Sequence, residues 1–146
     1  MRMDLIDQTL YPKFTKYIKN DLKSVAKVGS IRRAFMKYGQ LDHAGLKRAL
    51  NWGNNPKVNV NWTITDYGEF QPGVGSNVLQ IRRSLVLDFE AGRDWVRNKS
   101  GRRVHLAGAT VLHELIHWAD DQDGKDYKGE EGELFEQAVY GKVLSY

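Results

Sequence analysis

The chain has 146 residues, of which 41% are hydrophobic and 27% charged, and its formal net charge is +4 at pH 7. This composition is typical of one globular domain, so we expect a single domain over residues 1–146 and exclude a disordered or fibrous chain. Cysteine is absent, which excludes disulfides, thiolate metal sites and cysteine nucleophiles, so a tight metal site must use histidine and carboxylate ligands.

The first third of the chain predicts helices. Over residues 12–28, Pro12 suits a first helical turn and apolar side chains recur at the spacing of one helix face. A Gly-Ser pair interrupts this pattern, and further helices are expected over 31–38 and 42–53. We therefore expect residues 1–53 to form a helical N-terminal part.

The period then changes to that of strands. Apolar and polar side chains alternate over residues 58–64, and a second short strand is expected at 78–81. Together they predict a strand pair within residues 57–82. The glycine- and proline-containing segment 66–77 between them predicts a loop, and a short helix starts at Ser84.

The strongest helix prediction spans residues 104–121. This segment is apolar on nearly all sides, so the helix should be buried. A polar loop over 122–130 separates it from a last helix over 131–144. Helices with one small sheet predict an α+β, helix-rich fold.

Charge is unevenly distributed along the chain. Residues 1–50 carry 11 Lys and Arg against 4 acids, whereas residues 101–146 carry 5 against 9. The basic residues are spaced through amphipathic helices, without a zinc-finger or RNA-binding signature, so no nucleic-acid partner is expected. The first residues contain acids and no continuous apolar segment, which argues against a cleaved signal peptide. No apolar run approaches the roughly 18 residues of a membrane span.

Residues 113–117 form an H-E-x-x-H motif. On a helix, His113 and His117 point the same way and can both reach one Zn²⁺, while Glu114 projects beside the metal as a general base for its bound water. With 4 His in the chain, only about 0.005 chance matches are expected. Burial of these polar groups without partners would be costly, and a metal resolves that cost.

A catalytic zinc takes three protein ligands and keeps one position open. Helical geometry favours Glu136 as the third, because it falls at the rim of the apolar arc of the last helix, whereas Glu133 falls nearly opposite. Glu131 lies at the helix start, where the helix dipole favours a carboxylate in any case. Tyr140 lies one turn after Glu136 and either reaches the oxyanion, as a catalytic residue, or covers the site. The other acids that follow the motif are Asp120, Asp121, Asp123, Asp126 and Glu130.

These residues resemble a gluzincin-type, zincin-like metallopeptidase, in which two His and a later Glu hold zinc. The fuller context, His-Glu-Leu-Ile-His-Trp-Ala-Asp-Asp-Gln-Asp-Gly and then Glu-Glu-Gly-Glu-Leu-Phe-Glu-Gln-Ala-Val-Tyr-Gly, resembles the metallopeptidase toxin domains of type VI secretion spike proteins and other bacterial polymorphic toxins. The resemblance covers residues 104–141. Thermolysin-like gluzincins carry an Asp where this chain has Tyr140, so the group that orients a zinc histidine must come from elsewhere, such as Asp120, Asp121 or a backbone carbonyl.

The resemblance implies an antibacterial effector that hydrolyses a peptide amide in a protein or cell-wall peptide. It implies secretion without a signal peptide, by fusion to or carriage on a secretion spike, action in the periplasm of a target bacterium, and a cognate immunity protein. A cytoplasmic location is the alternative. Substrate backbone is expected to add to the exposed edge of the 77–82 strand, and the 66–77 loop, with Gly73 and Gly75, to line the cleft.

Two alternatives stay open at this point. A metzincin-like peptidase would use Asp123 as the third ligand, but Asp120 stands where that motif has Gly and no Met follows position 36 to form a Met-turn. A non-enzymatic binding module would hold a structural metal and use its basic N-terminal helices. Such a closed site would require a fourth protein ligand and would leave Glu114 without a role.

Overall fold

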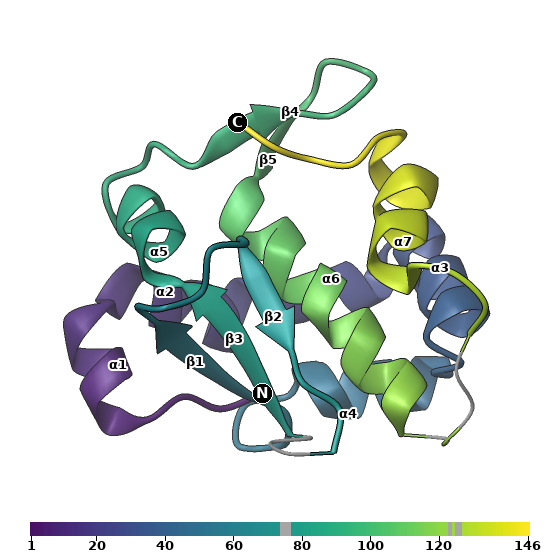
Figure 1. Cartoon of the computed structure of the whole chain (residues 1–146), viewed down its shortest axis with the longest axis horizontal. Helices are drawn as coiled ribbons and strands as arrows, with labels where there is room; N and C mark the ends of the chain where they lie inside the picture. Colours follow the sequence, from purple (N-terminus) through teal and green to yellow (C-terminus); the bar gives the residue numbers. More distant parts are fainter. Residues whose placement is uncertain (74–76, 123, 125–126) are drawn as a thin grey trace.

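The computed structural model describes residues 1–73, 77–122, 124 and 127–146. The fold combines helices with two small sheets, one of three strands and one of two, which confirms the predicted α+β class (Figure 1). No helix in the described part of the chain has the length and apolar character that crossing a membrane requires.

The N-terminal helices are more broken than their apolar periodicity predicts. The single helix expected over residues 12–28 begins as an α-helix at Pro12, becomes a π-helical turn at Tyr17 and continues as a 3₁₀ helix from Leu22. Asp42 caps the last of these helices by accepting a hydrogen bond from the Gly45 amide at 2.7 Å. The bounds are α1 (Leu5–Leu10), α2 (Pro12–Lys16), η1 (Tyr17–Asp21), η2 (Leu22–Lys27), α3 (Gly29–Tyr38) and α4 (His43–Leu50).

The larger sheet has the order β1-β3-β2, with β1 (Lys57–Asn61) parallel and β2 (Gly68–Phe70) antiparallel to β3 (Val78–Arg82). The segment predicted as a loop between two strands therefore contains a third strand. The prediction that substrate adds to an exposed edge of the 77–82 strand is wrong, because β3 is the central strand and pairs with another strand on each side. β2 forms one edge of the sheet and lies next to the central helix.

Helix α6 (Leu106–Asp121) is the centre of the molecule (Figure 1). It packs on β2 and β3, on α5 (Arg83–Glu90), on α3 and on α7 (Glu131–Tyr140). The hairpin of β4 (Trp95–Arg97) and β5 (Arg103–His105) leads into it. Fully buried Asp94 anchors the start of α6, because its carboxylate contacts the His105 imidazole at 2.9 Å and the Ala107 amide at 3.3 Å.

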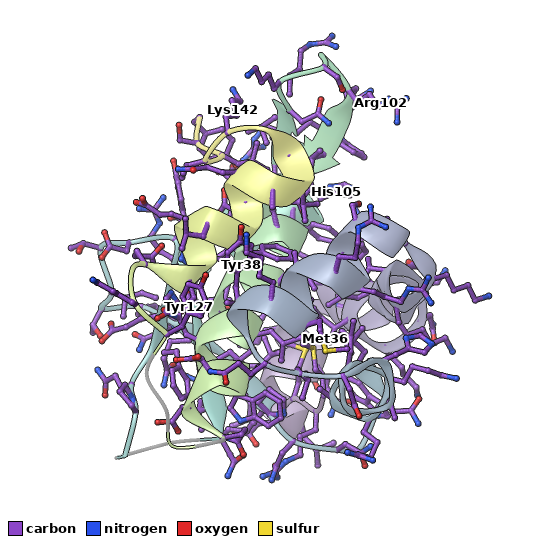
Figure 2. All side chains as sticks on the ribbon, turned by 90° about the vertical axis from the view of Figure 1, so that its right-hand side faces the viewer. Met36, Tyr38, Arg102, His105, Tyr127 and Lys142 are labelled. Atoms are coloured by element: carbon purple, nitrogen blue, oxygen red, sulfur yellow. The ribbon has the colours of Figure 1, made fainter. Side chains whose placement is uncertain are left out.

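Helix α7 ends earlier than its apolar pattern suggests. Gly141 adopts a left-handed conformation, with φ of 76°, and terminates the helix at Tyr140, whereas the prediction extended it to residue 144. Phe35 of α3 and Phe135 of α7 pack edge to face, with ring centroids 5.3 Å apart. Tyr38 and Tyr127 make a similar contact at 5.6 Å and hold the segment before α7 against α3 (Figure 2).

Candidate metal centre

Two imidazoles and one carboxylate converge beside α6. His113 and His117 lie one helical turn apart, with ring centroids 5.1 Å apart. The Oε1 atom of Glu130 lies 2.7 Å from Nε2 of His117 and 3.5 Å from Nε2 of His113. The donor atoms of these three residues all lie within 4.8 Å of one another. Two imidazole nitrogens and a carboxylate oxygen form the donor set that zinc takes in catalytic sites, so these residues fit a zinc ion.

Glu130 has two roles because its two oxygens face different ways. It is the N-cap of α7, where its Oε2 accepts a hydrogen bond from the Glu133 amide. This bond fixes the carboxylate and leaves Oε1 directed at the histidines. Hydrogen bonds from His113 and His117 lower the pKa of Glu130 against the opposing effect of partial burial. Glu130 is therefore an anion at neutral pH, as a metal ligand must be.

Two further carboxylates hold the far sides of the imidazole rings. Glu136 Oε1 lies 2.7 Å from Nδ1 of His113, and Glu131 Oε2 lies 2.9 Å from Nδ1 of His117. Both glutamates are buried, at 5% and 6% exposure. A carboxylate that accepts from Nδ1–H orients each ring with Nε2 towards Glu130, and loss of the Nε2 proton then frees its lone pair for a metal. Both rings therefore direct Nε2 towards Glu130, at the point where a metal would bind.

The structure brings some of the predicted site residues together and leaves others apart. Glu136 enters the site as predicted, but its carboxylate contacts Nδ1 of His113 rather than the side on which the three donors converge. Glu133 is exposed. Asp120 is buried and accepts hydrogen bonds from Gln40 and from the Tyr127 amide, and neither of these partners is a histidine. Asp123 and Asp126 lie outside the described residues.

Tyr140 does not join this group. Its ring packs edge to face on Phe135, with centroids 6.1 Å apart, and burial raises its pKa. It is not among the described residues that line the cleft beside the two histidines. This geometry gives no support to contact of Tyr140 with a reacting group.

Glu114 is buried next to the two histidines and lines the same cleft. Burial raises its pKa to about 7, although the neighbouring imidazoles act in the opposite direction. Strand β2 passes directly against it, because a Cβ on Gly68 would lie 2.6 Å from Oε1 of Glu114. A carboxyl group with a pKa near neutrality can both accept and release a proton at neutral pH.

The cleft has a volume of about 1050 Å³. Its floor is α6, one wall is β2 with the preceding residues 65–67, and the other wall is α7 with the C-terminal residues 143–145. Part of the segment predicted as a cleft-lining loop does line it, namely Asp66, Tyr67, Gly68, Phe70 and Pro72. Gly73 is not among the lining residues, and Gly75 lies outside the described residues.

Gly132 allows α7 to approach the metal centre, and we expect Gly132→Ala to disrupt it. An added Cβ would lie 2.2 Å from Nε2 of His113, so either the imidazole or the helix start must move. Such overpacking should lower the free energy of unfolding by about 1–3 kcal/mol and weaken metal binding, as measured by urea unfolding and metal titration.

The matched control for this substitution is Gly29→Ala, also at a helix start. A Cβ there meets only the flexible Arg33 guanidinium, at 3.3 Å. The control should unfold at nearly the wild-type urea concentration. Equal free energies of unfolding and equal metal affinities in the two variants would show that the close approach of Gly132 to His113 has no energetic consequence.

Comparison with known proteins gives one match. The sequence model of a family described as metallopeptidase toxin 3 matches residues 7–141. The matched region contains the whole three-stranded sheet, both histidines and the carboxylates around them. No curated protein and no solved structure matches the chain.

Proposed function

The chain belongs to the metallopeptidase toxin 3 family, and from this premise we propose that it is a zinc-dependent peptidase. The ligands of the proposed zinc are Nε2 of His113, Nε2 of His117 and a carboxylate oxygen of Glu130. The observation that carries the proposal is the pair of buried carboxylates on the two Nδ1 atoms, at 2.7 and 2.9 Å. They orient both imidazoles towards one point, which an ordinary pair of core histidines does not require.

This assignment gives Glu136 a different role from the one its sequence position suggests. We propose that Glu136 and Glu131 position the histidines and that Glu130 is the third ligand. The assignment of Glu130 as third ligand is supported because, among the described carboxylates, it alone forms a compact donor group with both imidazoles. Orienting carboxylates of this kind also make the imidazoles better ligands.

The chemistry divides between the metal and Glu114. A bound zinc ion supplies a Lewis acid that polarises the scissile carbonyl and acidifies the attacking water. Glu114 takes a proton from that water and returns it to the leaving amine. Its burial keeps the carboxyl group away from bulk water during the exchange.

We propose that substrate backbone adds to the free edge of β2. This edge lines the cleft, and Gly68 brings the strand against Glu114. An extended peptide that pairs with β2 gains main-chain hydrogen bonds, and its amide then lies beside the general base. The substrate is a protein or a cell-wall peptide, and the protein acts as a delivered antibacterial effector in the periplasm of a target cell. A carrier spike and a cognate immunity protein are its proposed partners.

The test compares metal-free and metal-restored protein. We expect one zinc per chain by elemental analysis and cleavage of an unstructured protein or of cell-wall stem peptides. A chelator should remove the activity, and one equivalent of Zn²⁺ should restore it. Cleavage that survives complete removal of metal would contradict the proposal. Stoichiometric zinc without cleavage of any peptide would favour a structural metal instead.

A further inference from the structure

The two ends of the cleft differ in charge. Where β2 begins, the lining residues include Tyr67, Arg82 and Leu144. Towards the end of α6, they include Asp120 and Asp121. Arg82 is the only Lys or Arg among the described residues that line the cleft. The one Lys or Arg among the described lining residues therefore lies where β2 begins, and Asp120 and Asp121 lie at the opposite end.

The Arg82 guanidinium is held in place by neighbouring groups. It is the last residue of β3, its Nη1 donates to the Thr65 carbonyl oxygen at 2.6 Å, and its Cζ lies 4.5 Å from the centroid of the Tyr67 ring. The C-terminal segment also packs on Tyr67, because the Tyr146 amide donates to the Tyr67 hydroxyl at 3.4 Å and the two rings pack edge to face. This end of the cleft is therefore lined by the C-terminal segment as well as by the residues around β2.

Arg82 also has unused hydrogen-bonding capacity. Its Nε atom is buried and has no hydrogen-bond partner among the described residues. No described carboxylate forms an ion pair with its guanidinium. Asp66 lines the same end of the cleft, but it is exposed. Arg82 is half-buried and lines the cleft, so the guanidinium nitrogens that face the cleft, rather than the buried Nε, are the donors that it offers to an anion.

We propose that Arg82 binds a carboxylate of the peptide substrate at the end of the cleft where β2 begins. A guanidinium presents a fork of donors that matches a carboxylate, and such charged hydrogen bonds are stronger than neutral ones. This inference rests on the proposed peptidase function and narrows its substrate class to peptides that carry a carboxylate near the scissile bond.

The proposal also sets the direction of the bound peptide. A peptide whose terminal carboxylate binds Arg82 ends where β2 begins, so it runs antiparallel to β2. Its N-terminal side then lies at the end of the cleft lined by Asp120 and Asp121, where a positive amine or a basic side chain is favoured. The carboxylate can be the chain terminus or an Asp or Glu side chain, since both offer the same two oxygens.

The experiment measures binding to the zinc-loaded Glu114→Gln protein by fluorescence anisotropy. Three hexapeptides carry the same N-terminal label: one ends in a free carboxylate, one in an amide, and one in an amide preceded by Glu. The free acid should bind about 10-fold more tightly than the plain amide, the size expected for one charged hydrogen-bonded contact. Tight binding of the third peptide as well would show that a side-chain carboxylate serves; weak binding would restrict recognition to the chain terminus.

Variants of Arg82 test the assignment. Arg82→Met, in the same background, should remove the preference for the acid without changing zinc content, and Arg82→Lys should keep part of it. The matched control is Arg97→Met, because Arg97 also donates to one backbone carbonyl but is exposed on the β4–β5 hairpin. The control should keep the full preference. If Arg82→Met does not fold, the affinities of the acid and amide peptides for the protein that retains Arg82 still test whether the cleft prefers a carboxylate.

Two results would overturn the assignment. Equal affinities of acid and amide peptides for the Arg82 protein would do so while leaving the peptidase function intact. Equal weakening of both peptides by Arg82→Met would instead make Arg82 a contact for the peptide backbone. If no peptide binds and the zinc-loaded wild type cleaves none, the peptidase function itself fails, and the role of Arg82 fails with it.

Discussion

Peptide cleavage by the Glu114→Gln variant is expected to fall by about 10²–10⁴-fold, the usual contribution of a general base. Gln has nearly the same shape as Glu, so it can occupy the space between Gly68 and the histidines. It cannot accept the proton of the attacking water. Glu114 contributes no atom to the donor group of His113, His117 and Glu130, so zinc content and unfolding should stay near wild type.

Glu133→Gln is the matched control for this loss. Glu133 lines the same cleft but is exposed. The control removes one negative charge from the cleft without removing the base, so its cleavage rate should stay within a few fold of wild type. A comparable loss in both variants would mean that the charge of the cleft, rather than proton transfer by Glu114, sets the rate.

Zinc affinity is expected to fall more in Glu130→Gln than in Glu136→Gln. Loss of a partner that only orients a histidine costs about 10–100-fold in metal affinity. Glu136→Gln should lie in that range, because it replaces the carboxylate at Nδ1 of His113. Glu130→Gln removes the anionic oxygen that faces both Nε2 atoms, so its loss should exceed that range. Competition with a chromogenic chelator measures both affinities.

The order of these two affinities decides which glutamate is the ligand. A larger loss in Glu136→Gln would return the third ligand to Glu136, as helical geometry alone suggests. The double variant adds a further check. If both residues act through His113, their effects on zinc affinity should not be additive, because they share one partner.

The sequence predicts the central part of the site because that part is local. The periodicity around residues 104–121 and the spacing of His113 and His117 determine which side chains share one face of α6. The apolar arc of the last helix likewise places Glu136 in a buried site. Helical position does not tell which atom of an imidazole a buried carboxylate meets. That depends on the distance and angle between α6 and α7, which only tertiary packing sets.

Glu130 is harder to predict because it lies outside the helix. A residue at an N-cap does not follow the helical wheel, and Glu is not among the residues that favour this position. The signal that points to it is its place three residues before Glu133, the spacing at which a cap side chain reaches a backbone amide. Without the structure, nothing indicates that the second carboxylate oxygen of Glu130 faces the two histidines.

The sequence does not predict the short strand β2, for a related reason. Strand β2 has three residues, Gly-Glu-Phe, which is too short for an alternating pattern, and its glycine disfavours a strand. Pairing with β3 and packing on α6 determine its conformation. The error about the exposed edge follows directly, since a missed third strand makes the central strand look like an edge.

The carboxylate of Glu136 joins two parts of the molecule that the chain separates. One oxygen meets Nδ1 of His113, and the other accepts from the Leu144 amide at 2.6 Å. Glu136 therefore connects the proposed ion site to the backbone of the C-terminal segment, and an ion that strengthens the contact between His113 and Glu136 should also strengthen the bond to the Leu144 amide. Hydrogen exchange at the single amide of Leu144 should slow when the ion binds, so this amide reports on a centre it does not touch.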